Sequence, residues 1–361
     1  MDAPAGKHFA TFAVIALSAA LVACGSSGKS LSHSSAATGG SRLQTATAVA
    51  PATGGPSAGR PAVANAGTSA TGGRRPTAAS TPRSATIGPG VGRPAVVIGD
   101  ESSPEENLLG ELYAQALGAK GYRVTLKDDL GPSQTCYKAL TSGQIDMYPE
   151  YIGTLLSAIA KEVTTPASAG ATYQRALAFV KARGLTLLNY TPFDDSDALA
   201  TRPRYAGEHS LSSIADLQTL GKSLTLGSSP EFATRFEGLV GLRREYGVNP
   251  TFKPIAPDLS FKALETGQVD VQSVSTAAGQ LLSGKFELLA DPKHVFGFQN
   301  VAPLVRQSVL TAEGPAFAKA LNKVSSLLTV EAIQKMNAAV GSDRQSASSV
   351  AQRFLSANGL A

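Results

Sequence analysis

One pattern of apolar and polar positions occurs twice along the chain. Residues 138–147 read KALTSGQIDM, and residues 262–271 read KALETGQVDV. In each copy a short helix ends after Lys-Ala-Leu at a glycine, which supplies the left-handed residue, and an alternating run begins a strand. The same succession of apolar strand, glycine, helix and second strand precedes each copy, starting at 96–99 and at 224–227. The sequence therefore predicts a duplicated βαβαβ unit.

Two such units predict an α/β protein of two lobes, with a ligand bound between them outside the carboxyl ends of the strands. We expect lobe 1 to comprise residues 95–200 and 303–361, and lobe 2 residues 201–302. The chain would cross between the lobes at 198–202 and again at 302–306. Two crossings make a hinge, so lobe closure about a ligand is the expected motion.

The periodicity predicts the individual elements of both lobes. In lobe 1 we expect strands at 96–99, 122–127, 145–148 and 185–189, with helices at 104–120, 133–142, 152–161 and 168–183. In lobe 2 we expect strands at 223–227, 251–255 and 269–272, with helices at 211–217, 232–246 and 259–266. Helices at 314–327, 330–339 and 346–357 complete lobe 1. Strands 145–148 and 269–272 should occupy equivalent places in different lobes.

The amino-terminal region predicts export. Lys7 and His8 precede an apolar run that ends at Ala23, which is too short for a comfortable membrane span and is typical of a signal peptide. The run closes on Leu-Val-Ala-Cys-Gly, which resembles a bacterial lipobox, so residues 1–24 would be a lipoprotein signal and Cys24 the lipidation site. The alternative is an ordinary export signal with an incidental cysteine. Lipidated Cys24 would anchor the chain to the outer face of the cell membrane.

Residues 25–94 are rich in Ser, Gly, Ala, Thr and Pro, a composition that predicts a disordered tether. This segment also explains the pI of about 9.1. Residues 1–99 hold eight of the 32 basic and one of the 27 acidic residues, which leaves 24 basic and 26 acidic residues in the body. Because the positive charge is diffuse and lies in the tether, nucleic-acid binding is disfavoured.

The body offers no constellation for catalysis. It contains no Gly-x-Ser-x-Gly elbow, Walker loop or His-x-x-x-His motif, so we expect neither an enzyme nor a cofactor. His209 and His294 are isolated from other metal-ligating residues, so no metal site is expected. With Cys24 lipidated, Cys136 has no disulfide partner, and we expect it to be a small buried apolar residue.

Several segments of the body resemble those of one family. They are 109–117 (LGELYAQAL), 138–154 ending YPEYIGT, 230–242 from Pro-Glu-Phe to Gly-Leu, 262–270, and 300–306. This set resembles the substrate-binding proteins of osmoprotectant ATP-binding-cassette importers, which carry glycine betaine, choline, carnitine or proline betaine. The resemblance spans about 96–359 and implies a two-lobed periplasmic-binding-protein fold of type II, a small-molecule solute, and permease and ATPase partners in the membrane. It implies no catalysis, and we expect a monomer.

The resemblance also implies a binding site. Tyr151 matches the family's first cage tyrosine, Thr154 its neighbouring donor and Arg235 its second-lobe arginine. Ser228 and Ser229 would add donors at a helix beginning near Pro230. Structural alternatives remain open: Tyr151 as a core residue, and Arg235 paired with Glu231.

Other cage positions depart from the family. Asp197 stands where a tyrosine is usual, and Val274 and Gln299 stand where aromatic residues are expected, with Phe298 beside Gln299. An alternative interpretation is that Asp194, Asp195 and Asp197 form a solvated turn and do not contact a ligand. Since a trimethylammonium group is held by aromatic faces, simple betaines should bind poorly. The remaining groups suit a larger polar solute with hydroxyls or an amine, including one with a ring that stacks on Tyr151. The alternative function is a ligand sensor or surface interaction protein on the same fold.

Overall fold

The computed structural model describes residues 88–361. The predicted signal peptide, Cys24 and the predicted tether as far as residue 87 lie outside these residues. No helix between residues 88 and 361 is both long and apolar enough to span a membrane.

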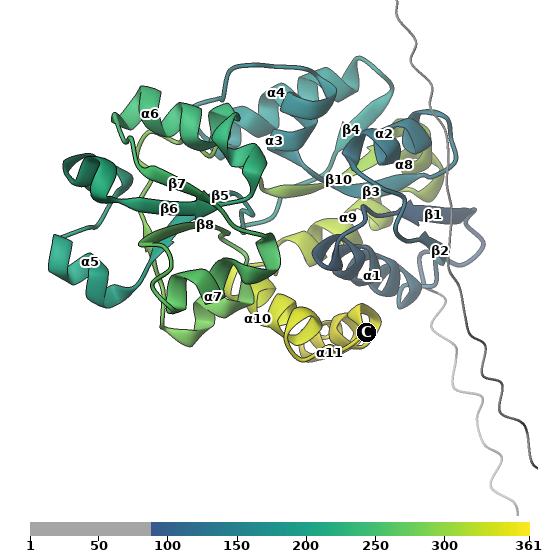
Figure 1. The fold of residues 1–361 in the computed structure, drawn as a ribbon. Helices are drawn as coiled ribbons and strands as arrows, with labels where there is room; N and C mark the ends of the chain where they lie inside the picture. The colour runs from purple at the N-terminus through teal and green to yellow at the C-terminus, as the bar shows by residue number, and fades with distance from the viewer. Residues whose placement is uncertain (1–87) are drawn as a thin grey trace, which may run out of the picture. The chain divides into compact units, whose positions relative to one another are not determined.

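Two five-stranded sheets form the framework, with helices on both faces (Figure 1). The first sheet has the order β2-β1-β3-β10-β4. Its strands are β1 (Ala95–Gly99), β2 (Arg123–Lys127), β3 (Met147–Tyr151), β4 (Leu185–Leu187) and β10 (Val301–Arg306). Its helices include α1 (Pro104–Gly118), α2 (Ser133–Thr141), α3 (Ile152–Thr154), α4 (Ala169–Lys181), α8 (Gln307–Glu313), α9 (Pro315–Ser325), α10 (Val330–Gly341) and α11 (Ala347–Ala357).

The second sheet has the order β7-β6-β8-β5-β9. Its strands are β5 (Asp197–Thr201), β6 (Thr225–Ser228), β7 (Thr251–Pro254), β8 (Val271–Ser275) and β9 (Glu287–Leu289). Figure 1 shows α6 (Gly241–Tyr246) on one face of this sheet and α7 (Ser260–Glu265) on the other. The helix α5 (Pro203–His209) follows β5.

The two sheets repeat the same pairing scheme. In the first, β3 lies between β1, to which it is parallel, and β10, to which it is antiparallel. In the second, β8 lies between parallel β6 and antiparallel β5. The two repeat strands therefore occupy equivalent places in different sheets, as the sequence predicted. In each repeat the helix ends at a glycine with positive φ, 78° at Gly143 and 74° at Gly267.

The repeated aspartate explains why the pattern recurs. Asp146 Oδ2 accepts a hydrogen bond from Val97 N at 2.8 Å, and its carboxylate pairs with Arg306. In the second sheet Asp270 Oδ2 accepts from Thr225 N at 2.9 Å, and its carboxylate lies 3.7 Å from Arg202. Each aspartate thus joins the backbone of a parallel strand to an arginine at or directly after the end of the antiparallel strand.

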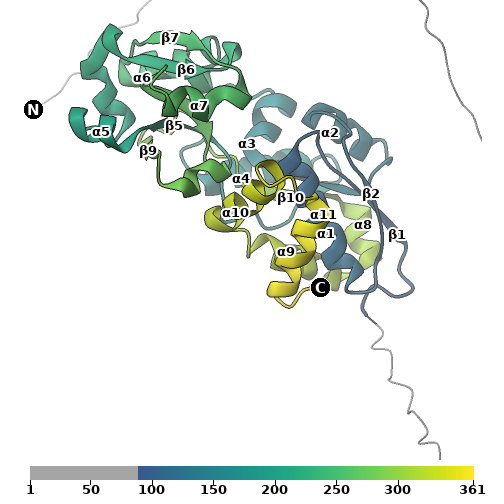
Figure 2. The same ribbon diagram turned by 60° about the horizontal axis from the view of Figure 1, so that its bottom comes forward.

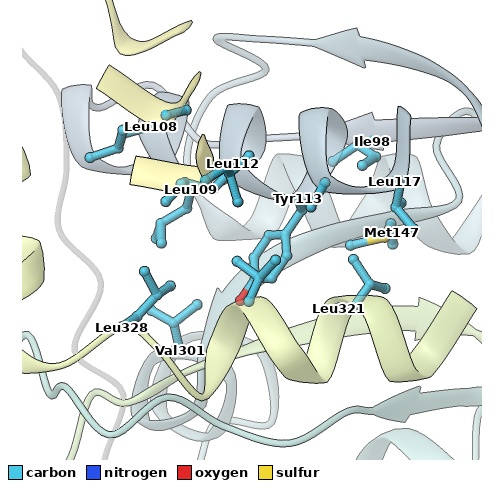
Figure 3. Packing of buried hydrophobic residues seen from close by; sticks show 14 of the residues in the cluster. Ile98, Leu108, Leu109, Leu112, Tyr113, Leu117, Met147, Val301, Leu321 and Leu328 are labelled. Atoms are coloured by element: carbon cyan, nitrogen blue, oxygen red, sulfur yellow. The ribbon is translucent and has the colours of Figure 1, made fainter. Parts of the chain in front are cut away.

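The first sheet packs against a leucine-rich face of α1 (Figure 3). The labelled side chains in this core are Ile98, Leu108, Leu109, Leu112, Tyr113, Leu117, Met147, Val301, Leu321 and Leu328. The Tyr113 hydroxyl, buried among them, lies 2.9 Å from Ser325 Oγ. Figure 2 shows α9 and α11 beside α1, so the carboxy-terminal helices complete the core that the amino-terminal half begins.

Several expected boundaries differ from the structure. Residues 197–201 form β5, which hydrogen-bonds to β8 and β9, so the first crossing precedes Asp197 instead of lying at 198–202. Residues 301–306 form β10 in the first sheet, so the return crossing ends at Asn300. The helices α5 and α8 and the strand β9 were not predicted.

The helix expected at 232–246 is divided. It consists of the 3₁₀ helix η3 (Pro230–Ala233), the π-helix η4 (Phe236–Val240) and α6. The break occurs where Glu237 and Gly238 have non-helical backbone angles. A Cβ on Gly238 would lie 2.4 Å from the carbonyl oxygen of Phe232, so this close approach of two backbone segments requires a glycine.

Candidate functional site

The crossing segments between the two sheets are held together by hydrogen bonds. Asp194 and Asn300 form an isolated antiparallel bridge, and Asp195 N donates to Gln299 O at 3.2 Å. Asp194 Oδ1 accepts from Gln299 N at 2.7 Å, while Asp195 accepts from Ser275 Oγ. These two aspartates therefore secure the hinge region and do not form a solvated turn.

A cavity of about 550 Å³ lies beside the crossings and is lined by residues of both lobes. Six of the eight predicted ligand-binding residues line it, namely Tyr151, Thr154, Asp197, Arg235, Phe298 and Gln299. The other two, Ser228 and Ser229, line a smaller cavity of about 300 Å³, which shares Asp197 and Arg235 with the first. The structure thus brings all eight residues into one connected region.

Tyr151, at the end of β3, belongs both to the cavity and to the first core. Its hydroxyl donates to Glu105 Oε1 at 2.8 Å, and Asn337 Nδ2 donates to Glu105 Oε2 at 2.5 Å. Burial, reinforced by the nearby charge of Asp195, raises the pKa of Glu105 to about 8. Asn337 also donates to Ala277 O at 3.0 Å, so this network joins the cavity wall to the second lobe.

Arg235 faces the cavity through an ion pair. Its Nη2 lies 2.8 Å from Asp197 Oδ2, and Ser273 Oγ donates to Asp197 Oδ1 at 3.3 Å. The structure therefore pairs Arg235 with Asp197 and not with Glu231. Burial raises the pKa of Asp197, an effect that the charge of Arg235 opposes. Because Asp197 neutralises Arg235, the arginine is a weaker anion-binding group than an unpaired one would be.

Gln299 has a local structural role. Its Oε1 accepts from Thr154 N at 3.0 Å and from Thr154 Oγ1 at 3.3 Å, so it holds the return crossing against α3. Beside it, the Phe298 ring contacts the imidazole of His294, with ring centroids 4.8 Å apart. Phe298 and Tyr151 are the half-buried aromatic side chains that face the cavity.

Ser228 and Ser229 lie at the end of β6, before η3. The helix expected to add a positive end there has four residues, so it is too short for an appreciable macrodipole. Val274, a cage position that departs from the family, is buried and lines the smaller cavity. This part of the region supplies serine hydroxyls and one aromatic side chain, Phe261.

Four glutamates that line the larger cavity, Glu101, Glu106, Glu162 and Glu237, were not among the predicted site residues. Glu106, in the first turn of α1, is fully buried, and Glu101 lies in the loop before α1. Burial raises the pKa of both carboxyls, in Glu106 well above its usual range. No sequence signal separates Glu106 from an ordinary helix-start acid, because acidic residues favour the first turn of any helix.

Cys136 is fully buried, as predicted. Its Sγ lies 3.5 Å from Asp100 O and 3.7 Å from Gly131 O. Burial and surrounding carboxylates raise the pKa of the thiol, so it is an unreactive core residue.

A protein-family comparison decides the class. Residues 94–357 match the substrate-binding domain of ABC-type glycine betaine transport systems. The chain belongs to this family. Members of the family capture small solutes outside the cytoplasm and act with the permease and ATPase of an ABC importer.

Relatives and solved structures agree with this assignment. A glycine-betaine-binding protein of Pseudomonas aeruginosa is 31% identical over 270 residues, which is 72% of this chain and 86% of that protein. The glycine betaine-binding protein YehZ of Escherichia coli is 27% identical over 275 residues, covering 73% of this chain and 90% of the relative. The fold matches a solved glycine betaine/carnitine/choline ABC transporter structure with a TM-score of 0.69 and 22% identity, over 73% of this chain and 99% of that one. The predicted type II periplasmic-binding-protein fold is confirmed.

Proposed function

We propose that this binding protein captures a solute that carries a positively charged nitrogen and hydrogen-bonding groups. The observation that carries the proposal is the charge of the larger cavity. Six lining residues are acidic and one is basic: Glu101, Glu106, Glu162, Asp195, Asp197, Glu237 and Arg235. Arg235 is paired with Asp197, and Glu162 is paired with Arg175 outside the lining, so Glu101, Glu106, Asp195 and Glu237 are the lining acids without an ion-pair partner among residues 88–361. A cavity of this charge attracts a cation and disfavours an anion.

The buried carboxyls respond to such a solute. Burial raises their pKa because it disfavours the charged form. A cation placed against them favours the charged form and lowers their pKa. Binding of the solute and ionisation of the wall are therefore coupled.

The aromatic content of the cavity argues against a simple betaine. The names of the relatives and of the solved structure mention glycine betaine, carnitine and choline, which all carry a trimethylammonium group. An aromatic face contributes about 0.5–2 kcal/mol to such a group, and three of the four cage positions are Asp197, Val274 and Gln299. The loss amounts to several kcal/mol, or at least about a hundredfold in affinity. We infer a solute larger than glycine betaine, with its carbon skeleton along Tyr151 and Phe298.

The remaining features of the proposal depend on the sequence. We propose that the chain performs no catalysis, that it acts as a monomer, and that lipidated Cys24 anchors it to the outer face of the cell membrane. Residues 25–87 would then be a tether between that anchor and the binding body, since the expected tether as far as residue 94 is too long: Gly90 and Arg93 hydrogen-bond to the body. The support is the apolar run ending at Cys24 and the low-complexity composition that follows it.

A thermal-shift panel tests the proposal. It would compare osmoprotectants, amines, sugars, polyols and phenolic compounds at 1 mM with protein in which the tether is intact. A solute with a micromolar Kd adds about 4 kcal/mol of stability at that concentration, which is a shift of several degrees. We expect that shift with amine solutes. A shift produced by neutral solutes alone would overturn the ligand class, and no shift with any solute would overturn the binding role.

A further inference from the structure

We propose that Glu106, with Glu101 beside it, forms a subsite that binds the N–H groups of a bound ammonium and selects such cations over trimethylammonium. The inference depends on the proposed function, because it specifies the chemistry of the solute that the same cavity would take. The subsite would lie on the lobe 1 wall. It would bind a cation through hydrogen bonds to carboxylates, whereas an aromatic cage binds one through ring faces.

The Glu106 carboxyl has no hydrogen-bond donor near it among the described residues. Its side chain is fully buried and lines the larger cavity, yet neither carboxyl oxygen has a hydrogen-bond partner within residues 88–361. Oε1 of Glu101, which lines the same cavity, is also buried without a partner. Buried polar atoms are nearly always paired, so unpaired oxygens at a cavity wall indicate a place for an external donor.

The neighbouring acids fall into two groups: Asp100 Oδ2 and Glu101 Oε1 lack a donor as Glu106 does, whereas Glu150 and Glu105 have donors. Glu150 is equally buried, but it accepts from Ser133 Oγ at 2.8 and 2.7 Å and from Tyr148 Oη at 2.6 Å. Glu105, the residue next to Glu106 on α1, accepts from Tyr151 and from Asn337. The fold therefore supplies donors to Glu150 and Glu105 from within, whereas both oxygens of Glu106 lack a donor among the described residues.

The charged groups that face Glu106 are all carboxyls. They come from the loop after β1 (Asp100 and Glu101), from α1 (Glu105) and from β3 (Glu150). Burial together with these neighbours raises the pKa of Glu106 well above its usual range. A bound ammonium would supply the missing positive charge and the missing donors at once.

Hydrogen-bonding capacity separates the two classes of cation. A primary ammonium has three N–H donors, and each methylation removes one, until a trimethylammonium has none. The quaternary group is instead attracted to aromatic faces, and the aromatic residues that line this cavity are Tyr151, Phe298 and the buried Phe296. Burying it against Glu106 would leave the carboxylate oxygens without hydrogen bonds, which costs affinity.

Methylation series at constant charge test the subsite. One series runs from ethanolamine through its N-methyl and N,N-dimethyl derivatives to choline, and a second runs from tyramine to its N,N,N-trimethyl derivative. Calorimetric titration at pH 7.5 should give a Kd that rises at least about tenfold from the primary to the quaternary amine. Equal or tighter binding of the quaternary members would overturn the inference.

Variants test whether Glu106 causes the preference for the primary amine. Glu106→Gln keeps the side-chain shape, removes the charge, and should abolish the preference for the primary amine and reduce proton release on binding. Glu111→Gln makes the same change on α1 outside the cavity and should retain both. If Glu106→Gln does not fold, Glu101→Gln serves in its place. Retained preference in the folded cavity variant contradicts the inference.

The outcomes distinguish this inference from the broader proposal. If a solute from the wider panel binds but no member of either methylation series does, the subsite is wrong and the binding role stands. If no solute of any class binds, the proposed function itself fails.

Discussion

Glu150 of the Tyr-Pro-Glu-Tyr motif should make the protein less stable as pH rises. The carboxyl is fully buried on β3, and burial raises its pKa from 4.5 to about 8 despite hydrogen bonds from Ser133 and Tyr148. Between these two values the folded state retains a proton that the unfolded state has lost. Stability from this group is therefore fully present below pH 4.5 and is lost as pH rises towards 8.

The magnitude follows from the same two values. One pKa unit corresponds to about 1.4 kcal/mol, so between pH 5 and pH 8 Glu150 alone should remove about 3 kcal/mol from the free energy of unfolding. Glu150→Gln removes the titration and keeps an oxygen that can accept from Ser133 and Tyr148. The variant should lose about 3 kcal/mol less than the wild type over this range.

Urea unfolding followed by circular dichroism at pH 5, 6, 7 and 8 measures this difference. Other buried acids contribute to the wild-type slope, but the comparison with Glu150→Gln isolates one group. Parallel slopes for the two proteins would refute the reasoning, as would a wild-type stability that rises with pH over this interval.

Three further predictions concern the anchor, the tether and the repeated aspartate. Cys24→Ala should yield a soluble protein or an uncleaved precursor in cell fractionation, and unchanged membrane association would indicate another anchor. Deletion of residues 25–87 should leave the melting temperature and ligand affinity unchanged, whereas a loss of folding would show that the segment is structural; residues 88–93 are kept because Gly90 N and Arg93 Nη1 donate to Lys120 O and Ala312 O of the body. Asp270→Ala should lower the free energy of unfolding by about 1–3 kcal/mol in urea titrations, because Thr225 N and Arg202 lose their partner, and no loss would contradict the role of this repeat.

The duplication could be predicted because its determinants are local. In both lobes the same turn is fixed by a glycine that ends a helix and by an aspartate three residues later. Both residues can be identified directly in the sequence. The aspartate's partners, Arg306 and Arg202, are far away in the chain and could not be identified from spacing. The structure supplies them.

The crossings and the acidic wall required tertiary information. Whether residues 197–201 pair with one sheet or the other depends on β8 and β9, which are distant in sequence. The break at Gly238 depends on its contact with the backbone of Phe232. Glu106 has the pattern of a helix-start acid, and only its burial without a partner at a cavity wall distinguishes it.

Calorimetric titration of the intact protein with glycine betaine and with a primary amine solute, in parallel, tests the central claim most directly. The acidic cavity and the loss of three aromatic cage positions predict that glycine betaine binds more weakly than about 100 μM and that the amine binds more tightly. Micromolar or tighter binding of glycine betaine, with weaker binding of the amine, would contradict the account.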